Sequence, residues 1–274
     1  MIAIIDGGST KCDWVILSQN HQLYLKTETP GFNPNIIQPN LISTEIQKNE
    51  KLNGLKESLE KMYFYGSGCG VAENRAIVQL EMQKAFPNAE ILVSEDLTAA
   101  AYSAYRGKPA IVCILGTGSN SCFFDGVAIT SKLPSLGFLI GDEGSGSAIG
   151  KHLLRRFFMK KLPKDLHEDF VKTYNLSIED ALRNMYHNPR ANAYLADFNK
   201  FVVTHKKHPY FQNMVFDEMK NFFEYHVLPY EESATAEDPR NDGRLGSTLS
   251  RAHRIGLHRF AEHRPVTPGR QYPV

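Results

Sequence analysis

Short apolar segments followed by small and polar residues are the main pattern in the first half of the chain. Residues 1–5 (MIAII) are too short for a helix and fit a buried strand. Asp6, two glycines, Ser9 and Thr10 follow directly, and adjacent glycines after a strand are typical of a tight turn. Strand-like alternation resumes in residues 12–17. The pattern predicts a hairpin, whereas a Rossmann fingerprint or a P-loop needs a helix after its glycines.

The same pattern returns near the middle of the chain. Residues 110–115 (AIVCIL) predict a buried strand, residues 116–120 (GTGSN) a small-residue turn with hydroxyls, and residues 121–124 a second strand. Two similar hairpins predict two similarly built lobes that face one ligand. We therefore expect an N-terminal lobe over residues 1–108 and a C-terminal lobe with a helical insertion over residues 109–230.

Helical and strand-like periodicities alternate between the two hairpins. Strands are predicted over 22–28, 62–65 and 90–94, and helices over 39–61 (with a break at 53–54), 72–86 and 97–105. A further helix is predicted over 147–161, followed by helical segments that break at Pro163, Pro189 and Pro209. Alternating strands and helices indicate an α/β fold, with helices packed against a sheet.

Composition excludes several classes of protein. A length of 274 residues is enough for one large domain or two lobes, and a net charge of +1 gives no reason for binding nucleic acid or an anionic membrane. We expect no secretory signal, and no apolar stretch approaches the roughly 20 residues of a membrane span. The four cysteines are separated and form no CxxC pair. This favours buried reduced thiols in a cytoplasmic protein, with a metal or cluster site as the minor alternative.

The composition changes abruptly near residue 231. Residues 1–230 contain 18 Lys and 6 Arg, whereas residues 231–274 contain 0 Lys and 7 Arg. A genuine polar tail is one interpretation. We favour the other, that residues 231–274 are an out-of-frame translation, because such a switch has no folding rationale. An uninterrupted reading frame through codon 274 of the source gene would refute it.

The first glycine turn is a candidate phosphate site. Backbone N–H groups in a tight turn can hold phosphate oxygens. The turn consists of Gly7, Gly8, Ser9, Thr10 and Lys11, and its last three residues add two hydroxyls and an ammonium group as further donors. Asp6 would repel a phosphate, so it is placed to meet a metal ion instead. An ordinary Gly-Gly hairpin turn is the competing interpretation.

Four further polar residues are candidates for binding, catalysis or helix capping. Asn33 offers a donor and an acceptor that suit a sugar hydroxyl, although an Asn before proline is commonly a turn residue. Asp96 lies at a strand-to-helix junction, where its competing role is a helix N-cap. Asp142 and Glu143 precede the helix over 147–161, and capping is the simplest role for both.

Four motifs in this order carry a family resemblance: DGGSTKCDW, EDLTAAAY, ILGTGSNS and GFLIGDEGSG. Together they resemble the N-acetylglucosamine kinase group of the BadF/BadG/BcrA/BcrD ATPase family, within the sugar-kinase, actin and heat-shock ATPase superfamily. The resemblance covers residues 1–160 with good motifs. It implies two ribonuclease-H-like lobes, an actin-like ATPase fold, flanking a nucleotide cleft. It also implies transfer of the γ-phosphoryl group of ATP–Mg²⁺ to a sugar 6-hydroxyl.

The resemblance also implies roles for individual residues. Thr10 and its glycine turn would hold the β- and γ-phosphates, Asp6 would hold Mg²⁺ through water, and Asp96 would be the catalytic base that also contacts the sugar. The second hairpin would contact phosphate through Gly116, Thr117 and Gly118. The expected sugar contacts are Asn33, Ser119, Asn120, Gly137 and Asp142. The partners implied are ATP and a small amino sugar, and a homodimer is compatible with the resemblance.

Two departures leave alternatives open. Relatives often carry a tryptophan where this chain has Leu136, so glucosamine or another amino sugar is an alternative to N-acetylglucosamine. The family's adenosine motif and closing helix are not found after residue 230. The alternative functions are an ATPase activator of a radical dehydratase, which needs a cluster-binding cysteine, and a non-catalytic sugar-binding pseudo-kinase.

Overall fold

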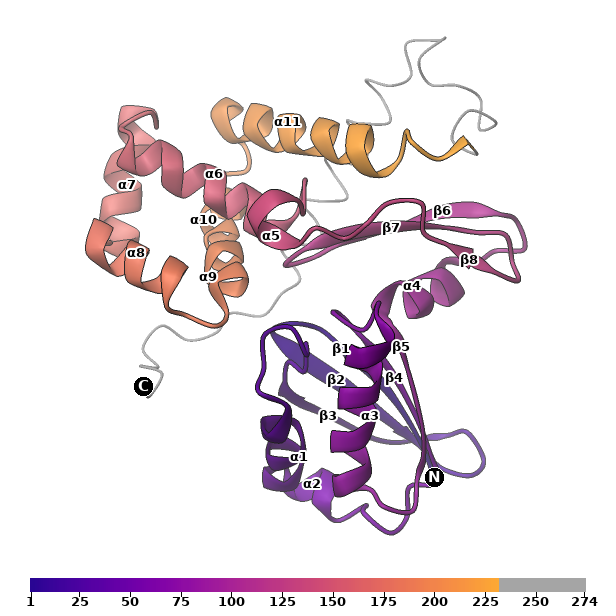
Figure 1. The fold of residues 1–274 in the computed structure, drawn as a ribbon. Coiled ribbons are helices and arrows are strands. Elements are labelled where there is room, and N and C mark those ends of the chain that lie inside the picture. Colours follow the sequence, from indigo (N-terminus) through magenta and orange to yellow (C-terminus); the bar gives the residue numbers. More distant parts are fainter. Residues whose placement is uncertain (232–274) are drawn as a thin grey trace.

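The computed structural model describes residues 1–231 (Figure 1). The predicted out-of-frame tail thus lies outside the described residues, apart from Glu231. The N-terminal part is a five-stranded sheet in the order β3-β2-β1-β4-β5. Its strands are β1 (Ile2–Gly7), β2 (Lys11–Leu17), β3 (Leu23–Pro30), β4 (Lys61–Gly66) and β5 (Glu90–Glu95). β1 pairs antiparallel with β2 and parallel with β4, so the predicted first hairpin is confirmed.

One face of this sheet is covered by α1 (Pro39–Lys48), α2 (Glu50–Asn53) and α3 (Ala72–Ala85), as Figure 1 shows. Alternate residues of each strand point to this side, because successive side chains of a strand lie on opposite faces. Ala3 and Ile5 are therefore fully buried, while Ile4 between them is 40% exposed. The predicted break at 53–54 in the helix over 39–61 is confirmed, since α2 ends at Asn53, but the helix does not resume after it. The helix also breaks at Asn49, whose side chain caps α2 by accepting the Leu52 N–H.

A short helix, α4 (Asp96–Ala104), connects the first sheet to the second. The second sheet contains β6 (Ala110–Leu115), β7 (Ser119–Phe124) and β8 (Ile129–Thr130) in that order. β6 and β7 form the predicted second hairpin. The buried side chains of α4, Leu97 and Ala101, share one core cluster with β6 and β7. The lobe boundary at residues 108 and 109 stays a prediction.

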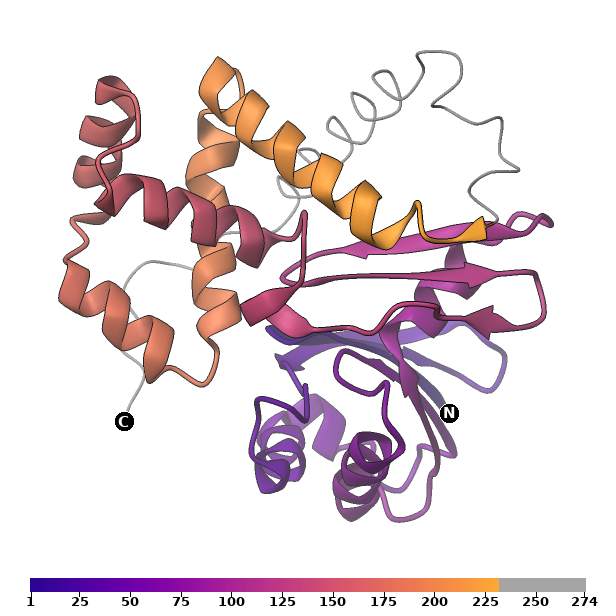
Figure 2. The same ribbon diagram turned by 45° about the horizontal axis from the view of Figure 1, so that its top comes forward.

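The remaining described residues are helical: α5 (Gly137–Ile140), α6 (Gly146–Phe158), α7 (Lys164–Tyr174), α8 (Ile178–Tyr186), α9 (Ala191–Asp197), α10 (Asn199–Thr204) and α11 (Pro209–His226). The predicted breaks at Pro163, Pro189 and Pro209 are confirmed, since each lies between two helices or opens one. Figures 1 and 2 both place α11 on the side of the second sheet opposite to α4. Within residues 1–231, no helix combines the length and apolarity needed to cross a membrane.

Candidate active site

The turn of the first hairpin is held by loops that follow two other strands. The Gly31 N–H donates to the Thr10 carbonyl at 3.0 Å, and the Ser67 N–H donates to the Gly7 carbonyl at 2.8 Å. The Ser9 and Ser67 hydroxyls lie 3.1 Å apart. Three loops thus meet at one end of the N-terminal sheet, where the carboxyl ends of the parallel strands β1, β4 and β5 also lie.

Asn33 is part of this loop junction. Its side chain is buried, its Nδ2 donates to Ser9 Oγ at 2.9 Å, and its Oδ1 accepts the Asn35 N–H at 3.0 Å. A Cβ on Gly68 would lie 2.2 Å from Asn33 Oδ1, so the residue is tightly enclosed there. The amide nitrogen therefore holds the first turn, while the amide oxygen holds the loop of Asn33 itself. The predicted sugar contact of Asn33 stays a prediction.

The turn of the second hairpin rests on the N-terminus of α6. The N–H groups of Gly146 and Ser147 donate to the carbonyls of Gly116 and Thr117 at 2.8 and 3.0 Å. The N-cap of α6 is Ser145, whose hydroxyl accepts the Ala148 N–H at 3.2 Å. The simplest interpretation of Asp142 and Glu143, as the caps of this helix, is therefore wrong.

The two hairpin turns lie against each other. Thr10 Oγ1 from the first turn and Thr117 Oγ1 from the second are 3.5 Å apart, although the residues are 107 positions apart in the sequence. The structure therefore brings together the two glycine-and-hydroxyl turns that the sequence singled out. Their binding of phosphate, including the roles of Gly8 and Gly116, stays a prediction.

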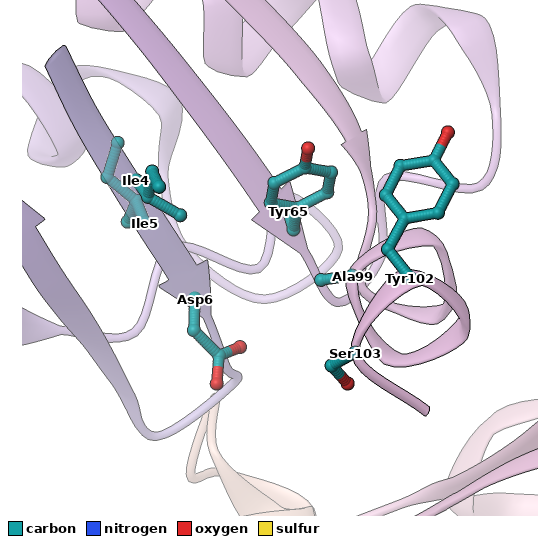
Figure 3. Close-up of a pocket in the computed structure, with 7 residues that line it drawn as sticks. All are labelled: Ile4, Ile5, Asp6, Tyr65, Ala99, Tyr102 and Ser103. Carbon is teal, nitrogen blue, oxygen red and sulfur yellow. The ribbon is translucent and has the colours of Figure 1, made fainter. Parts of the chain in front are cut away.

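Asp6 is the last residue but one of β1 and lies beside a cavity of about 420 Å³ (Figure 3). The cavity is lined by Ile4, Ile5, Asp6, Tyr65, Ala99, Tyr102 and Ser103. Its apolar walls partly desolvate the carboxyl and raise the pKa of Asp6, and the charge of its cross-strand neighbour Asp13 adds to this. Lys11 opposes the shift only weakly, because its Nζ pairs with Asp13 Oδ1 at 2.8 Å and with Glu28 Oε1 at 3.7 Å.

Mg²⁺ fits this end of the sheet only with ligands from outside the protein. Among residues 1–231, no three His, Cys, Asp or Glu side chains lie together in a way that could hold a metal ion. Mg²⁺ commonly binds through one or two carboxylates, with water and substrate phosphates completing its octahedron. Asp6 could supply one such carboxylate, whereas Asp13 is paired with Lys11. The donor set of the chain thus suits a cation that arrives with a nucleotide.

Asp96 is the first residue of α4, directly after β5. Burial raises the pKa of Asp96 to about 6, and the nearby carboxylates of Glu95 and Asp6 push in the same direction. A hydrogen bond from the Leu97 N–H to Asp96 Oδ1, at 3.0 Å, opposes the shift. The N-cap position of α4 belongs to Glu95, so the alternative that Asp96 is the cap is wrong. Near neutral pH Asp96 is ionised and more basic than an ordinary carboxylate, which suits a proton acceptor.

Asp142 lies at the second turn in the left-handed region, with φ of 62°. Its Oδ1 accepts the Ser119 N–H at 3.2 Å, and the Ser119 hydroxyl donates to the Glu143 carbonyl at 2.8 Å. A Cβ on Gly118 would lie 2.8 Å from Asp142 Oδ2, so only glycine leaves room there. Burial raises the pKa of Asp142, and the hydrogen bond from Ser119 limits the rise.

Two other predicted sugar contacts, Asn120 and Gly137, are close to this group in the sequence. Asn120 adjoins it on β7 and uses its Oδ1 to accept the Ser121 N–H at 2.9 Å. Gly137 opens α5 with φ of 69°, and a Cβ there would meet no heavy atom within 4 Å. Glycine is thus favoured at position 137 by the positive φ of its backbone and not by lack of space for a side chain. Its sugar contact, like that of Asn120, stays a prediction.

The four cysteines are free thiols, and Cys12, Cys69 and Cys122 are buried. Burial raises the pKa of Cys69 and of Cys113 to about 12. Thiols of this kind are poor metal ligands and poor nucleophiles, because the thiolate is the reactive form. The expected burial is confirmed for Cys12, Cys69 and Cys122, whereas Cys113 is only partly buried.

Sequence reasoning missed two residues on α11. Glu218 Oε2 accepts the Gly144 N–H at 3.2 Å, and His226 Nε2 lies 2.9 Å from Glu143 Oε2. These pairs join positions 74 and 83 residues apart, and no local pattern in the sequence connects them.

The fold and the two facing turns define a mixed α/β protein of the actin-like ATPase class, the fold of the sugar kinases. Residues 5–208 match the BadF/BadG/BcrA/BcrD ATPase family, and the chain belongs to this family. The structure of a candidate N-acetylglucosamine kinase from Porphyromonas gingivalis superposes with a TM-score of 0.79 and 30% identity, covering 95% of this chain and 98% of that one. The corresponding protein of Chromobacterium violaceum gives a TM-score of 0.63 at 18% identity, covering 93% and 90% of the two chains.

Two curated relatives are similar at lower identity. The N-acetyl-D-glucosamine kinase of Dictyostelium discoideum is 26% identical over 208 residues, which is 69% of this chain and 65% of that enzyme. The N-acetylmuramic acid/N-acetylglucosamine kinase of Clostridium acetobutylicum is 25% identical over 210 residues, covering 72% and 68%. The match to the Dictyostelium enzyme thus spans slightly less than two thirds of its length.

Proposed function

We propose that the chain is an ATP-dependent kinase of an amino sugar, with N-acetylglucosamine as the leading acceptor and its 6-phosphate as the product. The supporting observation is the contact between the two hairpin turns at Thr10 and Thr117. One pair of turns from two sheets can surround the phosphates of a single nucleotide. The names of the relatives agree with this activity, and the residue roles given below are those that the family resemblance implies.

In this proposal the protein acts mainly by positioning and by neutralising charge, which is what phosphoryl transfer requires. The turns at Thr10 and Thr117 hold the phosphates. Asp6 would hold Mg²⁺, which would supply positive charge to the phosphates. Asp96 accepts the proton of the sugar 6-hydroxyl as that oxygen attacks, a contribution of about 10²–10⁴-fold for a positioned general base.

Sugar recognition is assigned to the group around the second turn. Asp142, Ser119 and Asn120 carry acceptors and donors at the end of β7, and Asn33 and Gly137 are the further contacts. Leu136 is 56% exposed beside this group. It offers a smaller apolar surface than the tryptophan found in similar proteins, so glucosamine is the second candidate acceptor.

The test is ADP release from ATP and Mg²⁺ across a panel of amino sugars, with Asp96→Asn as the diagnostic variant. We expect sugar-dependent turnover that falls at least about 10²-fold in Asp96→Asn with little change in sugar affinity, because the amide cannot accept the proton. Asp165→Asn, on an exposed carboxylate in the first turn of α7, is the matched control. Sugar-independent hydrolysis with iron–sulfur absorbance would favour the dehydratase activator, and sugar binding without turnover would favour the pseudo-kinase.

A further inference from the structure

The loop that carries Asp142 is held in place by contacts with the helix α11. Glu218 on this helix is 3% exposed, and its Oε2 accepts the backbone N–H of Gly144 at 3.2 Å. The other oxygen, Oε1, lies 3.1 Å from His152 Nδ1 on α6. A buried carboxylate is costly unless its oxygens are paired. Glu218 satisfies this condition by tying the loop to two helices.

A second contact comes from the last residue of the same helix. His226 Nε2 lies 2.9 Å from Glu143 Oε2, and its ring stacks on Phe222 at 5.1 Å between centroids. An ionised carboxylate only accepts hydrogen bonds, so Nε2 must carry the proton. The neutral tautomer with hydrogen on Nε2 is sufficient for this bond. The orientation of Glu143, and with it the backbone next to Asp142, is therefore fixed from α11.

Packing between the loop and the helix is also very close. Gly144 has φ of 71°, and a Cβ there would lie 2.8 Å from Met219 Cε and from Phe222 Cβ. The loop backbone therefore lies directly on the face of α11 between Glu218 and His226. Asp142, two residues earlier, has φ of 62°, a conformation that needs support from its surroundings.

The end of α11 holds β7 as well as the loop. The Ser121 hydroxyl donates to the His226 carbonyl at 2.6 Å, and the Tyr230 hydroxyl donates to the Ser121 carbonyl at 3.0 Å. Ser121 is two residues from Ser119, which binds Asp142. One helix end thus sets the distance between the strand and the loop that together form the group assigned to the sugar.

We infer that Glu218 and His226 are positioning residues that hold Asp142 in its sugar-binding orientation. This inference rests on the proposed function. Neither residue reaches the sugar in this arrangement, because Glu218 acts through Gly144 and His226 acts through Glu143. They contact Glu143 and Gly144, whereas the turn at Thr117 is held by Gly146 and Ser147 at the start of α6, so we expect their loss to weaken sugar binding more than nucleotide binding. A purely structural pair would instead weaken both.

The test combines kinetics with amide hydrogen exchange in two pairs of variants. Glu218→Ala and His226→Phe remove the contacts, whereas Glu218→Gln and His226→Gln keep a hydrogen-bonding group. Since a hydrogen bond to a charged group is worth roughly tenfold or more, we expect the removing variants to raise the sugar KM about tenfold. The ATP KM should stay within about twofold, and the Gln variants should lie closer to the wild type.

Amide hydrogen exchange tests whether α11 holds the loop, and it does so without measuring turnover. Peptides covering residues 141–146 should exchange about tenfold faster in Glu218→Ala and His226→Phe, while peptides from the first sheet should not change. Glu224→Gln, on the exposed side of α11, and His187→Gln, at an exposed position after α8, are the matched controls and should match the wild type in both assays.

The outcomes separate this inference from the proposed function. A wild-type chain that phosphorylates no amino sugar contradicts the proposed function, and the exchange data then decide alone whether α11 holds the loop. Wild-type sugar turnover with unchanged sugar KM in the removing variants overturns the positioning role. Equal rises in sugar and ATP KM, or unchanged exchange of residues 141–146, overturn it too.

Discussion

The hydroxyl oxygens of Thr10 and Thr117 lie 3.5 Å apart across the junction of two sheets. Each threonine lies in the turn of a hairpin whose strands pair in register up to the turn. A contact between two such turns requires that the two sheets face each other with the ends that carry these turns. The proposed nucleotide site follows from this juxtaposition, because each turn alone is an ordinary small-residue hairpin turn.

The first prediction concerns Thr117, whose hydroxyl would donate to a phosphate oxygen. Thr117→Val keeps the shape and removes the donor, so we expect kcat/KM for ATP to fall about tenfold or more, the value of one hydrogen bond to a charged group. Steady-state kinetics at saturating sugar measures this. Thr130→Val, on the exposed end of the second sheet, is the matched control. A kcat/KM for ATP equal to that of the control would show that the second turn does not bind the nucleotide.

Most of the fold could be predicted from periodicity. The two hairpins, the strand 110–115 and the breaks at three prolines are local patterns, and local patterns set local structure. The predicted positions of the helix ends were less accurate, because the ends depend on capping contacts. Asn49 interrupts the predicted helix over 39–61 through a side-chain bond to Leu52 N–H, a contact that spacing alone does not reveal.

The site was only partly predictable, because tertiary contacts decide what each polar residue does. Gly7 was expected to allow close approach of backbone to a ligand. In the structure a Cβ there would lie 2.3 Å from Phe64 Cζ, so packing alone already requires glycine. Glu218 and His226 contact residues far away in sequence, and Asn33 turned inward to Ser9. The motifs identified the loops, whereas the contacts of each side chain could be known only from the three-dimensional fold.

The pH dependence of the reaction should report Asp96. As a base it works only when ionised, and its pKa is raised to about 6. We expect kcat/KM for the sugar to fall about tenfold per pH unit below that value, since this parameter reports the free enzyme. Glu95→Gln removes a charge that raises the pKa of Asp96, so the acid limb should move to lower pH. A limb that stays in place in Glu95→Gln would contradict this assignment.

Asp96→Asn should also stabilise the folded protein at neutral pH. The folded-state pKa of Asp96, about 6, exceeds its ordinary value of 3.8, so the folded state binds the proton more tightly than the unfolded state. The free energy of unfolding then falls as pH rises from about 4 to about 6 and stays lower above that range. The Asn variant lacks this loss, and we expect its unfolding free energy near pH 7 to be about 1–3 kcal/mol higher. Thermal denaturation checks this, and a lower midpoint than wild type would refute it.

Gly118 and Gly116 form a matched pair for testing the Asp142 group. A Cβ on Gly118 would lie 2.8 Å from Asp142 Oδ2, whereas a Cβ on Gly116 would meet only the Gly118 carbonyl oxygen at 4.0 Å. We expect Gly118→Ala to displace the carboxylate and raise the sugar KM about tenfold or more, while Gly116→Ala leaves it near the wild-type value. Calorimetric sugar titrations give the same comparison without turnover. Equal sugar affinities for the two variants would remove Asp142 from the sugar site.

Asp6 should set the requirement for Mg²⁺. In the proposed site it holds the ion through water, and loss of such an outer-shell partner typically weakens metal binding about 10–100-fold. Asp6→Asn should therefore need about that much more free Mg²⁺ for half-maximal rate, as measured by titrating MgCl₂ at fixed ATP. Asp13→Asn removes the cross-strand neighbour that pairs with Lys11 and keeps Asp6, so it should stay near wild type. If both variants shift the Mg²⁺ titration equally, the effect is one of general charge at the sheet edge and Asp6 has no specific role in holding the ion.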